Sequence, residues 1–208
     1  MKVSSLLGMT IAMLTLHAAI PLRADVGSWC PQGKQAFSAG KFEAANLALN
    51  SCLSSPPDDP ALAAEGYAMR GETYLKDLDY EAALSDFGRA VELDPANASA
   101  WRNKAWTHYK TNELHEAVTA IGKALEADSR DTRTHHVNAL ILTAMGRDLA
   151  AMDAYDLAYS FEDKATVKHL QEALKAQGYK AGAIDGVYGA RTRDALKKCI
   201  ADRCAIPL

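Results

Sequence analysis

A pattern of residues returns every 34 positions through the middle of this 208-residue chain. An aromatic or imidazole ring at Tyr67, Trp101 and His135 is followed, four positions later, by a small residue. The matching positions of the three units are Tyr67, Gly71, Tyr74, Ala83, Phe87, Ala90 and Pro95, then Trp101, Ala105, His108, Ala117, Ile121 and Ala124, then His135, Ala139, Leu142, Ala151, Tyr155 and Ala158. An earlier unit begins at Trp29, with its extra residues in the loop-like stretch 54–60. A fixed period of this length is typical of a stacked supersecondary unit.

Within each unit the apolar residues follow the 3.6-residue spacing of two amphipathic helices, joined by a short polar link such as KDLDY or KTNEL. Small residues such as Gly71, Ala83 and Ala90 let the two backbones approach closely, while Tyr74 and Phe87 fill the space beside them. One such hairpin cannot bury its own apolar face, but stacked hairpins can. An irregular helical bundle does not account for a fixed period. The sequence therefore predicts an all-α solenoid of about four helical hairpins.

This arrangement resembles the tetratricopeptide repeat (TPR) family, most clearly over 64–97. The resemblance implies a repeat region at 25–160, with units at about 26–59, 64–97, 98–131 and 132–163. Ala105, Ala139 and Ser129 depart from the Gly and Pro that the family pattern favours. The resemblance also implies that the first helices of the pairs line a concave face, which binds a protein or peptide.

Seven side chains are expected on that concave face and are candidates for protein or peptide binding. They are Lys76, Arg102, Trp106, Tyr109, Lys110, Arg133 and His136. Trp, Tyr and Arg are enriched at interaction hot spots. The alternative is that Trp106 only packs on the domain behind it. His135 falls at the aromatic position of its unit, so we expect it to pack rather than to bind.

The period stops after residue 164, and the sign of the charge reverses. Residues 165–208 hold 8 Lys and Arg against 4 Asp and Glu, whereas residues 25–164 are acidic. A change of this kind indicates separate modules. The second module carries an ordered set of residues, namely Leu170, Gln171, Leu174, Gly178, Tyr179, Asp185, Gly186, Tyr188, Gly189, Thr192, Ala195 and Leu196.

That order resembles the small peptidoglycan-binding domain of bacterial envelope proteins. The resemblance implies a compact three-helix domain over 165–208 that binds peptidoglycan. The candidate residues are Gln171, Tyr179, Asp185, Tyr188, Arg191, Thr192 and Arg193. The chain departs from the family at Cys199 and Ile200, where Phe-Gln is usual. The alternative is that the module only caps the repeats.

The four cysteines form two candidate disulfides. Cys30 and Cys52 lie at matching levels of the first hairpin, so a bridge between them would tie the terminal unit. Cys199 and Cys204 can bridge only if their helix ends near Ala201 and the tail folds back. Free buried thiols are the alternative for the first pair. The spacing of the cysteines and histidines does not suggest zinc.

The first 24 residues are typical of a secretory signal peptide. Lys2 precedes a mostly apolar run over 5–16, which is shorter than the ~20 residues that cross a bilayer. We expect cleavage after Ala24 and a periplasmic or secreted protein without membrane insertion. A retained anchor helix is the alternative. An even number of cysteines agrees with an oxidising compartment.

The sequence holds no HExxH, G-x-S-x-G or phosphate-loop motif, so we expect neither catalysis nor a cofactor or metal. The net charge of −3 argues against a nucleic-acid binder. The expected function is a non-enzymatic periplasmic scaffold, with an envelope protein or peptide in the groove and peptidoglycan on the C-terminal module. The alternative is a structural or regulatory subunit of a cell-wall-processing or secretion complex that does not bind peptidoglycan directly.

Overall fold

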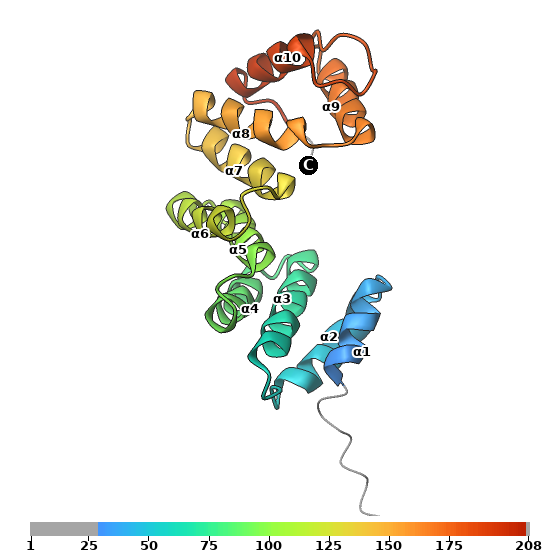
Figure 1. Ribbon diagram of the computed structural model, residues 1–208, viewed down its shortest axis with the longest axis vertical. Helices are drawn as coiled ribbons and strands as arrows, with labels where there is room; N and C mark the ends of the chain where they lie inside the picture. Colours follow the sequence, from blue (N-terminus) through green and yellow to red (C-terminus); the bar gives the residue numbers. More distant parts are fainter. Residues whose placement is uncertain (1–28, 207–208) are drawn as a thin grey trace, which may run out of the picture.

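A computed structural model describes residues 29–206, which are α-helical apart from the connecting loops (Figure 1). The proposed signal peptide lies outside the described residues. The helices are α1 (Trp29–Ser38), α2 (Phe42–Leu53), α3 (Pro60–Lys76), α4 (Tyr80–Leu93), α5 (Ala98–Lys110), α6 (Leu114–Ala127), α7 (Thr132–Ala144), α8 (Asp148–Ser160), α9 (Lys164–Ala176) and α10 (Ala190–Ala201). None of these described helices is both long and apolar enough to span a bilayer. The helices pair as α1–α2, α3–α4, α5–α6 and α7–α8. These pairs follow one another along the long axis, with α9 and α10 at one end (Figure 1).

Short polar side chains fix where several of the helices begin. Asp59, Asp79, Asn97, Asp131 and Asp163 each accept a hydrogen bond from a backbone N–H two or three residues further on. This contact satisfies one of the free N–H groups of the first helical turn. The acidic and amide residues between the units therefore act as helix start signals.

The link between the two helices of each pair contains one residue with a left-handed backbone. These residues are Gly40, Leu78, Asn112 and Gly146, with φ between 60° and 73°. The next N–H in each link donates to a carbonyl five residues earlier, at 2.8 to 2.9 Å. This is the Schellman arrangement that ends a helix. The same turn is thus used four times, which gives the pairs one shape.

Close helix packing in the second unit depends on Gly71. A Cβ atom at Gly71 would lie 2.8 Å from the ring of Phe87, which is fully buried. Ala105 and Ala139, which replace this glycine in the next two units, are also fully buried. The units with alanine therefore form the same closed helix pair as the unit with glycine.

The C-terminal domain has two helices of its own within residues 164–206, whereas the family resemblance implied three. Between them, φ is positive at Gly178, Gly182 and Gly186, and residues 177–189 form a loop. The helix α8 of the last repeat packs against α10. Buried side chains of α8, α9 and α10 form one apolar cluster, which includes Tyr155 and Leu196.

The buried amide of Gln171 holds this loop in place. Its Nε2 donates to Asp185 Oδ1 at 3.0 Å, to the Val187 carbonyl at 3.1 Å and to Thr192 Oγ1 at 3.1 Å. Its Oε1 accepts from the Gly186 N–H at 2.9 Å. A single side chain from α9 therefore joins three parts of the loop to the start of α10.

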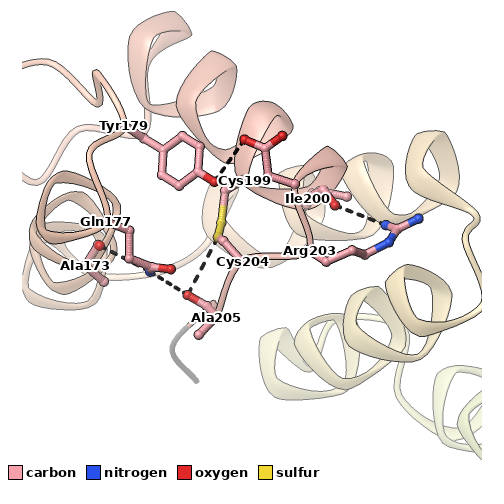
Figure 2. Close-up of a disulfide and its surroundings, with 9 residues drawn as sticks. Ala173, Gln177, Tyr179, Cys199, Ile200, Arg203, Cys204 and Ala205 are labelled. Atoms are coloured by element: carbon pink, nitrogen blue, oxygen red, sulfur yellow. Dashed lines mark hydrogen bonds between the residues drawn. A yellow bond between two sulfur atoms is a disulfide. The ribbon is translucent and has the colours of Figure 1, made fainter.

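Two disulfides are present in the structure. Cys30 and Cys52 join α1 to α2 with their Cα atoms 5.1 Å apart. The helix α10 ends at Ala201, and Arg203 has a left-handed backbone, so that Cys204 returns to Cys199 (Figure 2). The geometry expected for the second pair is confirmed. Beyond the disulfide, Gln177 donates to the Ala205 carbonyl at 2.7 Å and ties the tail to α9.

We predict that the two disulfides differ in their effect on stability. Replacing Cys30 and Cys52 with Ala should lower the free energy of unfolding by about 3 kcal/mol, because this bridge closes the longer loop. The Cys199→Ala, Cys204→Ala variant serves as the comparison and should lose about 2 kcal/mol. Urea denaturation of the oxidised proteins measures both. A larger loss in the comparison variant would contradict the loop-length argument.

A second prediction concerns the loop amide. Gln171→Leu should destabilise the C-terminal domain by roughly 1–3 kcal/mol, because the buried Gly186 N–H loses its acceptor. Hydrogen exchange at the amides of residues 186–192 should accelerate accordingly. The control is Gln35→Leu on the exposed surface of α1, which should leave these amides unchanged. Unaltered exchange in Gln171→Leu would show that the loop does not need this side chain.

Candidate binding surfaces

Arg102, which was predicted to bind a partner on the concave face, instead contacts a neighbouring repeat. Its side chain is 10% exposed and forms an ion pair with Asp131 at the start of α7. Asp131 also accepts from Thr134 at 2.7 Å. Burial opposes ionisation of Asp131, but Thr134 and the charge of Arg102 together hold its pKa below the usual value. Arg102 therefore stabilises the contact between neighbouring repeats, and its guanidinium is not free for a partner.

A half-buried polar contact lies beside this ion pair. Asn103 donates to Glu72 on α3 at 2.9 Å. Burial raises the pKa of Glu72, while the charge of Arg102 opposes the shift. The neighbouring candidate Lys76 is exposed, and its ammonium lies 4.4 Å from the ring centroid of Phe42. The α3 end of the face thus offers one accessible cation.

Trp106, Tyr109 and Lys110 gather on α5. The rings of Trp106 and Tyr109 are 5.3 Å apart, and the Lys110 ammonium lies 5.3 Å from the Trp106 ring centroid. They line a cavity of about 370 Å³ together with Leu140, Thr143 and Ala144 of α7. The tail from Arg203 to Ile206 forms its other wall. Trp106 is therefore half-buried beside the tail, and the cavity beside it stays open.

The last two concave-face candidates lie on α7 and differ in exposure. His136 is 5% exposed, and its ring lies 4.6 Å from that of Tyr159. Burial lowers the pKa of His136, so its neutral form predominates at pH 7. Arg133 is well exposed, and its Nε lies 3.5 Å from Asp131 Oδ1.

A second small cavity, of about 230 Å³, lies in the C-terminal domain between the loop and the start of α10. Asp185, Arg191 and the backbone of 181–183 line it, together with Gln171 and Thr192. Hydrogen bonds from the Gln171 amide and the Val187 N–H lower the pKa of Asp185. The stem of Arg191 lies against Gly182, where a Cβ would come within 3.3 Å. Of the candidates at this cavity, Asp185 and Arg191 are exposed.

The other peptidoglycan-binding candidates make hydrogen bonds or ion pairs within the protein. Gln171 and Thr192 are buried, and Thr192 donates to the Ala181 carbonyl at 3.2 Å. Tyr179 donates to Asp202 at 3.0 Å. These three side chains hold the loop and the end of α10, which is a structural role that the family motif alone did not distinguish from binding.

Tyr188 and Arg193 join the C-terminal domain to the last repeat. The Tyr188 hydroxyl donates to Asp156 Oδ1 at 2.8 Å, and Arg193 pairs with the same carboxylate of α8 at 2.7 Å. The Tyr188 ring stacks on Tyr159 at 5.2 Å. Burial raises the pKa of the Tyr188 hydroxyl, as does the hydrogen bond to Asp156. Asp156 was missed from the sequence because nothing in the repeat pattern marks it.

In the part of the chain that the structure describes, no group of three His, Cys, Asp or Glu side chains is placed to hold a metal ion. Two of the open cavities are lined by accessible side chains that were predicted to bind a partner or peptidoglycan. One lies beside Trp106, and the other lies beside Asp185 and Arg191.

Comparisons with known families and proteins match both regions. Residues 74–141 match the tetratricopeptide repeat family, and residues 163–199 match the family described as putative peptidoglycan binding domain. Serine/threonine-protein phosphatase 5 of Rattus norvegicus is 29% identical over 139 residues, which are 62% of this chain and 28% of the phosphatase. Small glutamine-rich tetratricopeptide repeat-containing protein 2 of Saccharomyces cerevisiae is 27% identical over 160 residues, covering 74% of this chain and 45% of that protein. The chain thus spans less than half the length of these relatives.

Solved structures resemble the chain over most of its length. The MamA protein aligns with a TM-score of 0.60 and 20% identity, covering 88% of this chain and 97% of MamA. A thermophilic TPR protein of Thermus thermophilus aligns with a TM-score of 0.60 and 16% identity, covering 85% of this chain and 98% of that protein. At such identity the likeness establishes the fold alone. Residues 74–141 are therefore identified as tetratricopeptide repeats, and residues 163–199 are similar to the putative peptidoglycan binding domain family.

Proposed function

We propose that this protein is an exported, non-enzymatic scaffold of the bacterial cell envelope. Its repeats, at about 25–160, bind a protein or peptide partner on the concave face. Its C-terminal domain, at 165–208, binds peptidoglycan. The observation that carries the second part is the preformed cavity between the loop and α10, with Asp185 and Arg191 exposed beside it.

The chemistry of this cavity suits the peptide part of the cell wall. The guanidinium of Arg191 can bind a carboxylate in a two-pronged contact, and stem peptides carry carboxylates. Asp185 and the loop carbonyls offer acceptors for amide or hydroxyl groups. Because Gln171 holds the loop from within, the site is ordered before a ligand arrives, and this reduces the entropic cost of binding.

The cavity beside Trp106 supports binding of a protein segment by the repeats. Two aromatic rings and one Lys ammonium face a cavity of about 370 Å³, within the usual size range of ligand pockets. Stacked helical repeats generally act as interaction scaffolds through their concave surface. The absence of catalytic motifs in the sequence supports a role in binding rather than in chemistry.

Export is supported by three features. The N-terminal 24 residues have the composition of a signal peptide. Both disulfides suit an oxidising compartment. A domain of peptidoglycan-binding type has its ligand outside the cytoplasm.

A second candidate function is that of a structural or regulatory subunit of a wall-processing or secretion complex, without direct peptidoglycan binding. It is favoured by the contacts of Tyr188 and Arg193 with Asp156. Through these contacts, two residues proposed to bind peptidoglycan instead attach the C-terminal domain to the last repeat, as expected of a domain that only caps the repeats.

Binding to purified sacculi separates the two candidates. We predict that Arg191→Glu lowers retention of the oxidised protein at least about tenfold, because it replaces a charge-assisted contact with repulsion. The matched control is Lys197→Glu, which makes the same charge change at an exposed site of α10 and should be retained normally. A parent protein that is not retained would argue for the second candidate, whereas equal retention of both variants and the parent would show that the Arg191 cavity is not the binding site.

Site-specific crosslinking tests the concave face in living cells. A photoreactive residue at position 109 should capture an envelope protein, because Tyr109 lines the open cavity of the repeats. The control position is His115, which is exposed on α6. Trp106→Ala in the chain labelled at 109 should reduce the yield several-fold, since buried aromatic anchors dominate such interfaces. Equal capture from both positions would contradict the proposed groove.

A further inference from the structure

A third cavity lies where the last repeat meets the C-terminal domain, and neither resemblance accounts for it. Its volume is about 420 Å³. Its polar walls come from three helices and one link. The residues are Arg133 and His136 of α7, Tyr159 of α8, Glu162 of the α8–α9 link, and Thr166 and His169 of α9. Figure 1 shows α7, α8 and α9 close together at this end of the molecule.

One of the side chains that line the cavity has a buried polar atom without a hydrogen-bond partner. His136 is only 5% exposed, and its Nε2 atom makes no hydrogen bond in the structure. A buried, unpaired polar atom is destabilising, so its persistence calls for an explanation. Because the neutral ring can carry its proton on Nε2, this atom can donate to an acceptor placed in the cavity.

The remaining walls carry charges of both signs. The Arg133 guanidinium is exposed toward solvent and is only 3.5 Å from a carboxylate that Arg102 already neutralises. Glu162 is half-buried and has no ion-pair partner among the described residues. Glu162 lines the cavity together with His136 and Tyr159. A purely anionic ligand would be repelled by Glu162, and a purely cationic one by Arg133.

We propose that this junction cavity binds the end of a peptide that carries both a carboxylate and a free amino group. The carboxylate lies against Arg133 and His136 Nε2, and the ammonium lies against Glu162. The ring of Tyr159 and the side chain of Leu170 cover the aliphatic part of the ligand. The inference rests on the proposed function only for the source of such an end, which is the stem peptide of peptidoglycan.

Calorimetric titration of the full oxidised chain tests this chemistry with defined peptides. The probe is N-acetyl-Ala-Glu-Lys, whose terminal lysine carries a carboxylate and an ammonium group. Two modified peptides complete the set. One has the C-terminal carboxylate amidated, and the other has the lysine side-chain amine acetylated. We expect each blocked peptide to bind at least about tenfold more weakly than the parent peptide, since each loses one charge-assisted contact.

Three variants assign the contacts to residues. Arg133→Ala and His136→Leu should weaken the free peptide about tenfold and leave the amidated peptide unchanged. Glu162→Gln should remove the preference for the free over the acetylated amine. The matched controls are Arg130→Ala and His115→Gln, at exposed positions outside the cavity. His136→Leu also separates binding from packing, because it removes the unpaired nitrogen and should leave the midpoint of thermal unfolding equal or higher.

The outcomes distinguish this inference from the function it extends. Retention on sacculi without any preference for the free peptide over its blocked forms would overturn the junction site and leave peptidoglycan binding intact. Preference for the free peptide without retention on sacculi would support the site and reject the wall as the source of its ligand. Free lysine binding as tightly as the tripeptide would likewise indicate a small amino acid as the source.

Discussion

The close approach of the two helices within each pair is the constraint on which the rest of the molecule depends. A Cβ at Gly33 would meet Leu49 at 2.7 Å, just as one at Gly71 would meet Phe87. In the later units, alanines occupy this place and share apolar clusters with Ile121 and Tyr155. Because every pair closes in the same way and turns through the same left-handed link, each pair presents its first helix on the same side. The concave face is a consequence of this repetition.

The apolar core does not end with the fourth helix pair. The helix α8 shares its buried cluster with α9 and α10, and Asp156 holds Tyr188 and Arg193 across the boundary. A terminal repeat needs its outer face covered, and here the C-terminal domain covers it. The cavity beside Trp106 and the loop cavity are consequently held in a fixed relation to each other.

The sequence period was sufficient to predict the helices and their order, because a repeated buried face requires apolar residues at regular positions. The family motif also located Gln171 and Thr192, although it assigned them to a ligand rather than to the loop they hold. The sequence pattern did not predict the roles of Asp156, Glu162 and Ile206 at the junction. Each depends on residues that are distant in sequence meeting across the junction, and a single charged residue in an acidic chain carries no positional signal. The same reason explains why Arg102, predicted for the concave face, proved to pair with Asp131.

A line of three rings crosses the junction between the last repeat and the C-terminal domain. His136 on α7 lies 4.6 Å from Tyr159, and Tyr159 lies 5.2 Å from Tyr188 in the loop domain. Because such aromatic contacts have preferred geometries, a displacement of Tyr188 would shift Tyr159 and, through it, His136. A ligand that binds only the docked arrangement stabilises that arrangement by its own binding free energy. Occupancy of the junction cavity would therefore strengthen the attachment of the C-terminal domain to the repeats, because the residues that would contact the ligand belong to both.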